Sequence, residues 1–78
     1  MISIVVPLLD EQDSLVELVQ RIQSAIQLGQ LGEFEVILID DGSRDDSWQI
    51  IERLAAEKSF VRGIRFRRNF GKAAALSA

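Results

Sequence analysis

Cysteine and histidine are both absent from this chain of 78 residues. Without cysteine it can form neither a disulfide framework nor a cysteine-based zinc site. Without histidine it lacks the usual general base near neutral pH and the commonest metal ligand. Any acid–base or metal chemistry must therefore rely on aspartate and glutamate, and serine–histidine hydrolysis by this chain alone is excluded.

Long hydrophobic runs are also missing. No apolar stretch approaches the roughly 20 residues that a helix needs to cross a bilayer. The first seven residues have no basic region of the kind that begins a secretory signal, and they read as a strand. We therefore expect one small domain over residues 1–78, located in the cytoplasm.

The charges are unevenly distributed along the chain. All 12 acidic residues lie within residues 1–57. Every charged residue within 58–78 is basic: Lys58, Arg62, Arg65, Arg67, Arg68 and Lys72. Such a segment suits phosphates or an anionic membrane surface. For Arg62 and Arg65 a solvated surface is the favoured interpretation, whereas the basic residues that follow the third predicted strand favour function.

The hydrophobic pattern alternates between strands and helices. Strands are expected over residues 2–6, 34–39 and 61–66, the first ended by Pro7 and covered on both faces. Ser14-x-x-Glu17 has the spacing of a capping box for a first helix, which Gly29 and Gly32 end. Asp45 or Asp46 is expected to cap a second helix, and a third helix is expected over residues 72–78.

The order β-α-β-α-β-α predicts an α/β fold with parallel strands and right-handed crossovers. The last helix is short, and a three-stranded sheet leaves edges that need partners. We therefore expect a three-layer, Rossmann-like half-domain that is the first part of a larger domain. The alternative is a complete small domain that oligomerises through its exposed sheet edges.

Two adjacent carboxylates, Asp40 and Asp41, follow the second predicted strand. Open parallel sheets bind their ligands at the carboxyl ends of their strands. Gly42 permits a tight turn there. Carboxylates at this position can accept hydrogen bonds from a base or a sugar, or bind Mg²⁺. For these two residues we favour function over a simple turn, whereas for Asp45 and Asp46 we favour helix capping.

Two further segments follow strands and are expected at the same edge of the sheet. Asp10 and Glu11 come after the first strand, where acids at a helix start are a plain alternative explanation. Arg67, Arg68 and Lys72 come after the third, where they can hold phosphate oxygens or lie in water. No G-x-G-x-x-G follows the first strand, and the sequence lacks a P-loop, so neither familiar phosphate motif is present.

These three segments, in this order, resemble the family 2 glycosyltransferases. The segment IVVPLLDE at residues 4–11 looks like the opening strand and Pro-x-Tyr-Asn-Glu loop of that family. VILIDDGSRD at residues 36–45 is the most specific match. RNFGKAAAL at residues 68–76 is similar to the branch with polyprenyl-phosphate acceptors, which includes dolichyl-phosphate mannose synthase-like and bactoprenol glucosyltransferase-like enzymes.

The resemblance implies a GT-A fold and transfer of a hexose from a nucleotide-diphosphate sugar, usually with Mg²⁺ or Mn²⁺. It also implies a lipid-phosphate acceptor, a place at the cytoplasmic face of a membrane, and no nucleic-acid partner. The implied nucleotide-binding residues are Pro7, Leu9, Glu11, Asp40 and Asp41, with one of the two aspartates reading the base edge. Arg68 and Lys72 are expected near the donor diphosphate or the acceptor phosphate.

The sequence departs from the family pattern in two ways. Leu9 and Asp10 stand where the family usually has Tyr-Asn, and leucine can neither stack nor hydrogen-bond as tyrosine does. The Asp-x-Asp metal motif and the catalytic base of the family come later than residue 78. The resemblance therefore implies no catalytic residue and no metal ligand within these residues, and an inactive chain when alone.

Two other functions fit the acidic edge. One is a non-catalytic α/β module that binds a nucleotide or Mg²⁺. The other is a receiver-like phosphoacceptor domain, which also gathers acids on a parallel sheet. Receiver domains usually have the acidic pair after the first strand, whereas here the tightest pair follows the second, so this function is disfavoured.

Overall fold

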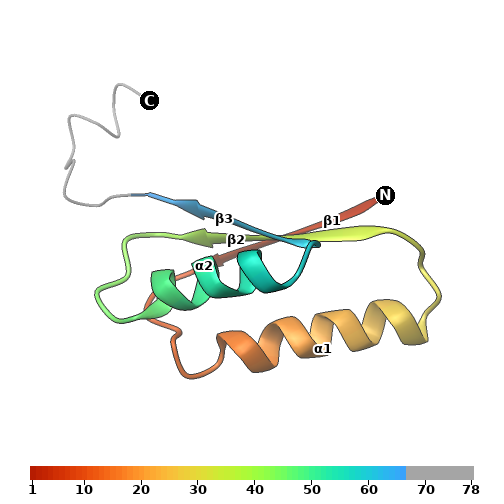
Figure 1. Cartoon of the computed structure of the whole chain (residues 1–78), viewed down its shortest axis with the longest axis horizontal. Helices are drawn as coiled ribbons and strands as arrows, with labels where there is room; N and C mark the ends of the chain where they lie inside the picture. The colour runs from red at the N-terminus through yellow and green to blue at the C-terminus, as the bar shows by residue number, and fades with distance from the viewer. Residues whose placement is uncertain (67–78) are drawn as a thin grey trace.

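Three strands and two helices alternate along residues 1–66, the part that this computed structural model describes. The elements are β1 (Ile2–Leu8), α1 (Leu15–Leu28), β2 (Phe34–Asp40), α2 (Ser47–Glu57) and β3 (Val61–Arg65) (Figure 1). The predicted alternation is confirmed for these five elements. The predicted basic loop and the helix over residues 72–78 lie outside the described residues.

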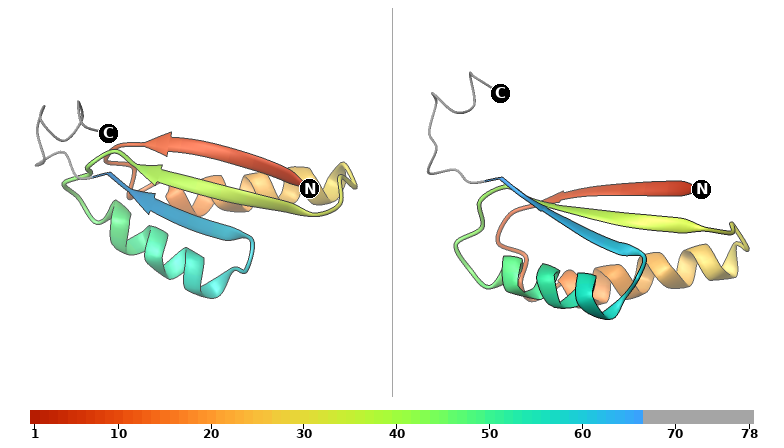
Figure 2. Two further views of the ribbon diagram at one scale, coloured as in Figure 1. Left: turned by 90° about the horizontal axis from the view of Figure 1, so that it is seen from above. Right: turned by 45° about the horizontal axis from the view of Figure 1, so that its top comes forward.

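The strands form one parallel sheet in the order β1-β2-β3. Their carboxyl ends all point to the same side, on the left in Figure 1. Both helices lie against the same face of the sheet (Figure 2), as right-handed crossovers in one direction require. The described residues therefore make two layers of a Rossmann-like α/β domain.

The core lies between this sheet face and the helices. Alternate residues of β2 are fully buried there, since successive side chains of a strand point to opposite faces. Val36 and Leu38 are 0% exposed and pack with residues of both helices. Those helical residues recur at three- and four-residue spacing, which gives one apolar face per helix: they are Leu15, Val19, Ile51 and Leu54.

Pro7 does not end the first strand, contrary to the prediction. β1 continues to Leu8, and Pro7 pairs in register with Ile39. The Ile2 N–H donates to the Glu33 carbonyl, and the Leu8 carbonyl accepts from the Asp41 N–H. The backbone N–H and C=O groups of even-numbered β1 residues therefore point toward β2. Pro7 is odd-numbered, so its backbone nitrogen points away from β2, toward the outer edge of the sheet. A missing N–H therefore costs no hydrogen bond within the sheet.

The predicted capping box at the start of α1 is also wrong. Ser14 is the N-cap residue, but its side chain caps no backbone N–H. Its hydroxyl donates instead to the Glu11 carboxylate at 2.8 Å. The other member of the box, Glu17, forms an ion pair with Arg21 one turn along the helix. The Ser14 hydroxyl therefore bonds within the loop before α1, although the local spacing predicted a bond to the helix.

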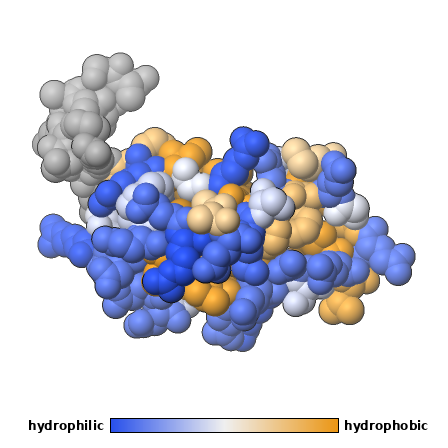
Figure 3. Space-filling view, in the orientation of Figure 1, coloured by the Kyte–Doolittle hydropathy of each residue, from blue (hydrophilic) through white to orange (hydrophobic). Residues whose placement is uncertain are grey.

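The sheet face away from the helices is open in the described residues, so the prediction of strands covered on both faces is not met there. Val5, Ile64 and Phe66 are 56%, 44% and 55% exposed. In Figure 3, hydrophobic surface appears along the upper, sheet side of the view. At the far end of this face Glu35 accepts a hydrogen bond from Ser3 and pairs with the exposed Arg62 at 3.5 Å, which confirms Arg62 as a surface charge.

Neither helix within residues 1–66 has both the length and the hydrophobicity to cross a membrane.

Candidate functional site

Two loops meet at the carboxyl edge of the sheet, where open parallel sheets bind ligands. Residues 9–14 connect β1 to α1, and residues 41–46 connect β2 to α2. Both loops lie at the same end of the molecule in Figures 1 and 2. They carry most of the acidic residues that the sequence singled out.

The two neighbouring aspartates have different environments. Asp40 is the last residue of β2 and is 0% exposed, on the same face as Val36 and Leu38. Its Oδ1 accepts the Ser43 N–H at 2.7 Å and so closes the turn in which Gly42 has a φ of 87°. Its buried Oδ2 receives no hydrogen bond from the described residues. Asp40 therefore shapes the turn from inside.

Asp41, one residue further, is exposed. Its backbone N–H donates to the carbonyl of Leu8 at 3.0 Å, which anchors it to the end of the neighbouring strand. An exposed carboxylate on an anchored backbone is suited to accept hydrogen bonds from a ligand. Of the two aspartates, Asp41 is therefore the one whose side chain is accessible from solvent.

The two loops are joined by reciprocal hydrogen bonds, which we call the interloop network. In one direction, three successive N–H groups of the first loop donate to side chains of the second loop and of Ser47, the first residue of α2. Asp10 N donates to Ser43 Oγ at 2.8 Å, and Glu11 N donates to Ser47 Oγ at 2.9 Å. Gln12 N donates to Asp45 Oδ2 at 3.3 Å.

In the other direction, three N–H groups of the second loop donate to side chains of the first. The Arg44 and Asp45 N–H groups donate to Asp10 Oδ1 at 2.8 and 3.4 Å. The Asp46 N–H donates to Gln12 Oε1 at 2.9 Å. These bonds join residues 33 to 36 positions apart, so the loops form one unit.

Asp45 joins the interloop network to the start of α2. Its Oδ1 accepts both the N–H and the hydroxyl of Ser47, whose side chain is buried. Asp46, the N-cap residue, makes no capping bond with its side chain. The predicted capping role is therefore confirmed for Asp45 and wrong for Asp46. The Ser47 hydroxyl lowers the pKa of the Asp45 carboxyl below its ordinary value.

The lowered pKa of Asp45 predicts a specific acid sensitivity. A carboxyl whose pKa is lower in the folded state stabilises the fold above its unfolded pKa and loses that effect as pH falls through the folded value. Between about pH 4 and pH 2, unfolding free energy should fall less steeply for Asp45→Asn than for the wild type. Urea unfolding at several pH values measures both slopes, and equal slopes would contradict the prediction.

The remaining predicted residues lie in different places. Glu11 is exposed within the first loop, and its Oε2 is held by Ser14. Pro7 is exposed on β1, and Leu9 is 37% exposed just beyond that strand. The structure thus brings Leu9, Glu11 and Asp41 to one edge. Arg68 and Lys72 lie outside the described residues.

Two arginines lie at this end of the sheet among the residues described, Arg44 in the second loop and Arg65 at the end of β3. Arg65 is the last residue of β3 and pairs in register with Asp40. Its guanidinium lies over the Trp48 ring of α2, 5.6 Å from the centroid, in a cation–π arrangement. From the sequence, Arg65 was predicted to be a solvated surface charge. The stacking of its side chain on α2 was not predicted.

The acidic edge does not form a metal site by itself. Within residues 1–66 no three acidic side chains are grouped closely enough to hold a metal ion. The side chains of Asp10 and Asp45 are already engaged by N–H donors of the interloop network. The Mg²⁺ or Mn²⁺ that the resemblance implies therefore does not fit the described residues.

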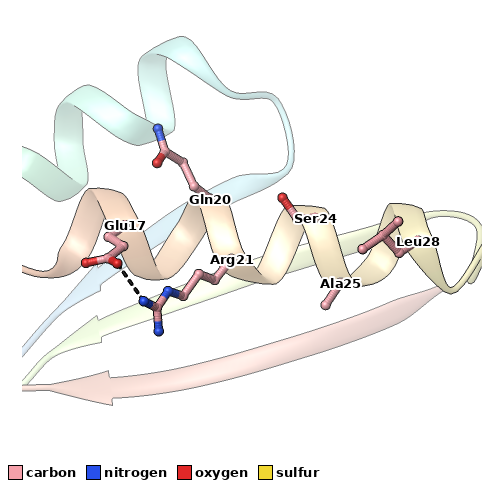
Figure 4. A pocket seen from close by; sticks show the side chains of 6 residues that line it. All are labelled: Glu17, Gln20, Arg21, Ser24, Ala25 and Leu28. Carbon is pink, nitrogen blue, oxygen red and sulfur yellow. Dashed lines mark hydrogen bonds and ion pairs between the residues drawn. The ribbon is translucent and has the colours of Figure 1, made fainter.

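Two hollows on the described surface are not lined by Glu11 or Asp41. One of about 470 Å³ follows α1 between Glu17 and Leu28. Figure 4 shows that its lining side chains come from this helix, with Glu17 and Arg21 paired one turn apart along it. Another, of about 420 Å³, lies between the starts of α1 and α2. The first is lined by one helix, and the second by a mixed set of acids, amides, one cation and one apolar residue: Gln12, Asp13, Asp46, Gln49, Ile50 and Arg53.

Sequence reasoning missed the interloop network. Asp10 was expected at this edge, but its bonds to the second loop and the parts played by Ser43 and Ser47 were not predicted. Their partners are distant in sequence, so no local spacing indicates them. The one available signal was that loops after parallel strands share an edge, and polar residues on such loops can bond to each other.

Open parallel α/β sheets of this kind bind their ligands at the carboxyl ends of the strands. The family model for glycosyl transferase family 2 matches residues 3–78, and the chain belongs to this family. This confirms the family that the three sequence segments indicated.

Two curated relatives cover nearly the whole chain. Over 79 residues it is 48% identical to an undecaprenyl-phosphate 4-deoxy-4-formamido-L-arabinose transferase of Pseudomonas fluorescens (strain SBW25). Over 80 residues it is 46% identical to the protein of the same name from Pseudomonas syringae pv. syringae (strain B728a). Each match covers 99% of this chain but only 23% of the relative. No solved structure matches it.

Proposed function

We propose that this chain is the donor-nucleotide-binding part of a glycosyltransferase that transfers a sugar from a nucleotide-diphosphate sugar. The sequence resemblance implies a hexose, whereas the relatives' names specify an arabinose derivative, which is a pentose. The observation that carries the proposal is the exposed Asp41, anchored to Leu8 and fixed beside the first loop by the interloop network. Membership of glycosyl transferase family 2 gives this edge its class of ligand.

Asp41 is proposed to read the base. A carboxylate only accepts hydrogen bonds, so it favours bases with a ring N–H on their pairing edge, which uracil and guanine have and adenine and cytosine lack. Asp40 supports this role from inside by holding the Ser43 N–H. Glu11 is proposed to line the same nucleoside pocket from the first loop, with Pro7 and Leu9 beside it.

The diphosphate is proposed to lie away from this edge. Phosphate oxygens are repelled by the carboxylates gathered in the two loops. Cationic groups must therefore hold them, and Arg68 and Lys72 are the proposed candidates near the donor or the acceptor phosphate. The metal ion is proposed to be bound by residues outside residues 1–66.

The acceptor is proposed to be a polyprenyl phosphate. Both relatives are named undecaprenyl-phosphate 4-deoxy-4-formamido-L-arabinose transferase, and this chain spans about a quarter of their length. The proposed parent enzyme would act at the cytoplasmic face of a membrane, where a lipid phosphate is accessible. Its catalytic base and metal ligands would come from the other three quarters.

Calorimetric titration of the chain tests the proposal. UDP or GDP should bind, whereas MgCl₂ alone should give no binding heat because no acidic cluster among the described residues forms a metal site. Binding of Mg²⁺ without either nucleotide would contradict the proposal and support the non-catalytic metal-binding module. Absence of binding by both nucleotides would also contradict it.

A further inference from the structure

We infer that Asp10 is a positioning residue for nucleotide binding, which fixes the loop that carries Asp41 against the loop that carries Glu11. This inference rests on the proposed function. Asp10 is not expected to touch the ligand. Its carboxylate is directed into the second loop, where Oδ1 accepts the N–H groups of Arg44 and Asp45.

The backbone of Asp10 is held in an unusual conformation. Its φ is 52°, in the left-handed region that residues other than glycine enter at a cost. The cost is offset by three hydrogen bonds to the second loop: two accepted by Oδ1 and one donated by its own N–H to Ser43 Oγ. Strain maintained by contacts at a ligand-binding edge is typical of a pre-organised site.

Asp10 is suited to position the loop rather than to stabilise the whole fold. Its three bonds are exposed and lie in loops, outside the core between sheet and helices. Such regions open locally at low free energy, without global unfolding. Loss of these bonds should therefore allow residues 41–44 to move while the sheet and both helices remain folded.

The geometry also predicts which substitution preserves the role. One oxygen, Oδ1, accepts both N–H groups, so the negative charge and the second oxygen are not required. Asparagine supplies that oxygen and tolerates the left-handed region better than most residues. Alanine supplies no acceptor. Asp10→Asn should therefore keep the position of the loop, and Asp10→Ala should lose it.

The test is UDP titration of the full chain and its variants, with melting temperature measured in parallel. Asp10→Ala should raise the Kd about tenfold, which corresponds to the loss of about two ordinary hydrogen bonds. Asp10→Asn should stay within about twofold of the wild type. Asp13→Ala is the matched control, because it removes an acid of the same loop that has no hydrogen bond or ion pair among the described residues; it should also stay within about twofold.

Ser43→Ala gives an independent variant if Asp10→Ala does not fold. It removes the acceptor of the Asp10 N–H at an exposed position, where water can replace it. It should weaken UDP binding with little change in melting temperature. Faster hydrogen exchange at the Arg44 amide in Asp10→Ala would show directly that the loop is released.

The outcomes separate the two proposals. If the wild type binds UDP and Asp10→Ala binds equally well, the positioning role is wrong and the proposed function stands. If Asp10→Asn fails as badly as Asp10→Ala, Oδ1 is not the essential group and the inference is wrong. If the wild type binds neither UDP nor GDP, the proposed function fails and the positioning role fails with it.

Discussion

Asp41→Ala should weaken UDP binding about tenfold or more and change the unfolding free energy by less than about 0.5 kcal/mol. The carboxylate of Asp41 is exposed, and surface substitutions of this kind rarely affect stability. Its loss removes a charged acceptor from the proposed base site, and hydrogen bonds to charged groups are the stronger ones.

Asp40→Ala is the matched comparison, and it should affect the unfolding free energy more than UDP binding. It should reduce the unfolding free energy by about 1–3 kcal/mol, because the partly buried Ser43 N–H loses its acceptor and a cavity forms beneath the turn. Urea unfolding and UDP calorimetry on both variants provide the measurements. If Asp41→Ala retained wild-type binding, Asp41 would not be the base-reading residue.

Gly63→Ala should destabilise the fold by about 1–3 kcal/mol, the usual effect of overpacking. Gly63 pairs with Leu38 on the helix-facing side of the sheet, where α2 crosses β3. An added Cβ there would overlap the side chain of the fully buried Ile51 and lie 3.3 Å from the Trp48 ring. Neither neighbour can move without disturbing the core.

Gly29→Ala is the control for this prediction. An added Cβ at Gly29 would lie 3.2 Å from the Leu31 side chain, which is 54% exposed and can move away. Thermal melting should show a loss of roughly 4–8 °C per kcal/mol for Gly63→Ala, as expected for a domain of this size. An unchanged melting temperature for Gly63→Ala would contradict the observed packing of α2 on β3.

The fold was predictable from the sequence because local residue patterns indicate each strand and each helix. Apolar runs gave the strands, and a stripe such as Leu15, Val19 and Ile26 gave a helix with one buried face. Pro7 was misjudged because its effect depends on which strand edge it faces. That edge is fixed only by pairing with β2, which is a long-range property.

The candidate site was predictable in place but not in detail. Asp40 follows Val36 and Leu38 at two-residue spacing, so the strand period already indicates that it is buried and that Asp41 is not. The interloop network could not be predicted in the same way. It depends on contacts between loops more than 30 residues apart, such as Asp10 with Arg44, for which the sequence has no periodic signal.

A nuclear magnetic resonance titration of the isotope-labelled chain with UDP tests the central claim most directly. Amide shift changes should be concentrated in the two loops, at residues 9–12 and 41–46, with little change along α1. Shift changes confined to the hollow between Glu17 and Leu28, or no change at saturating UDP, would contradict it.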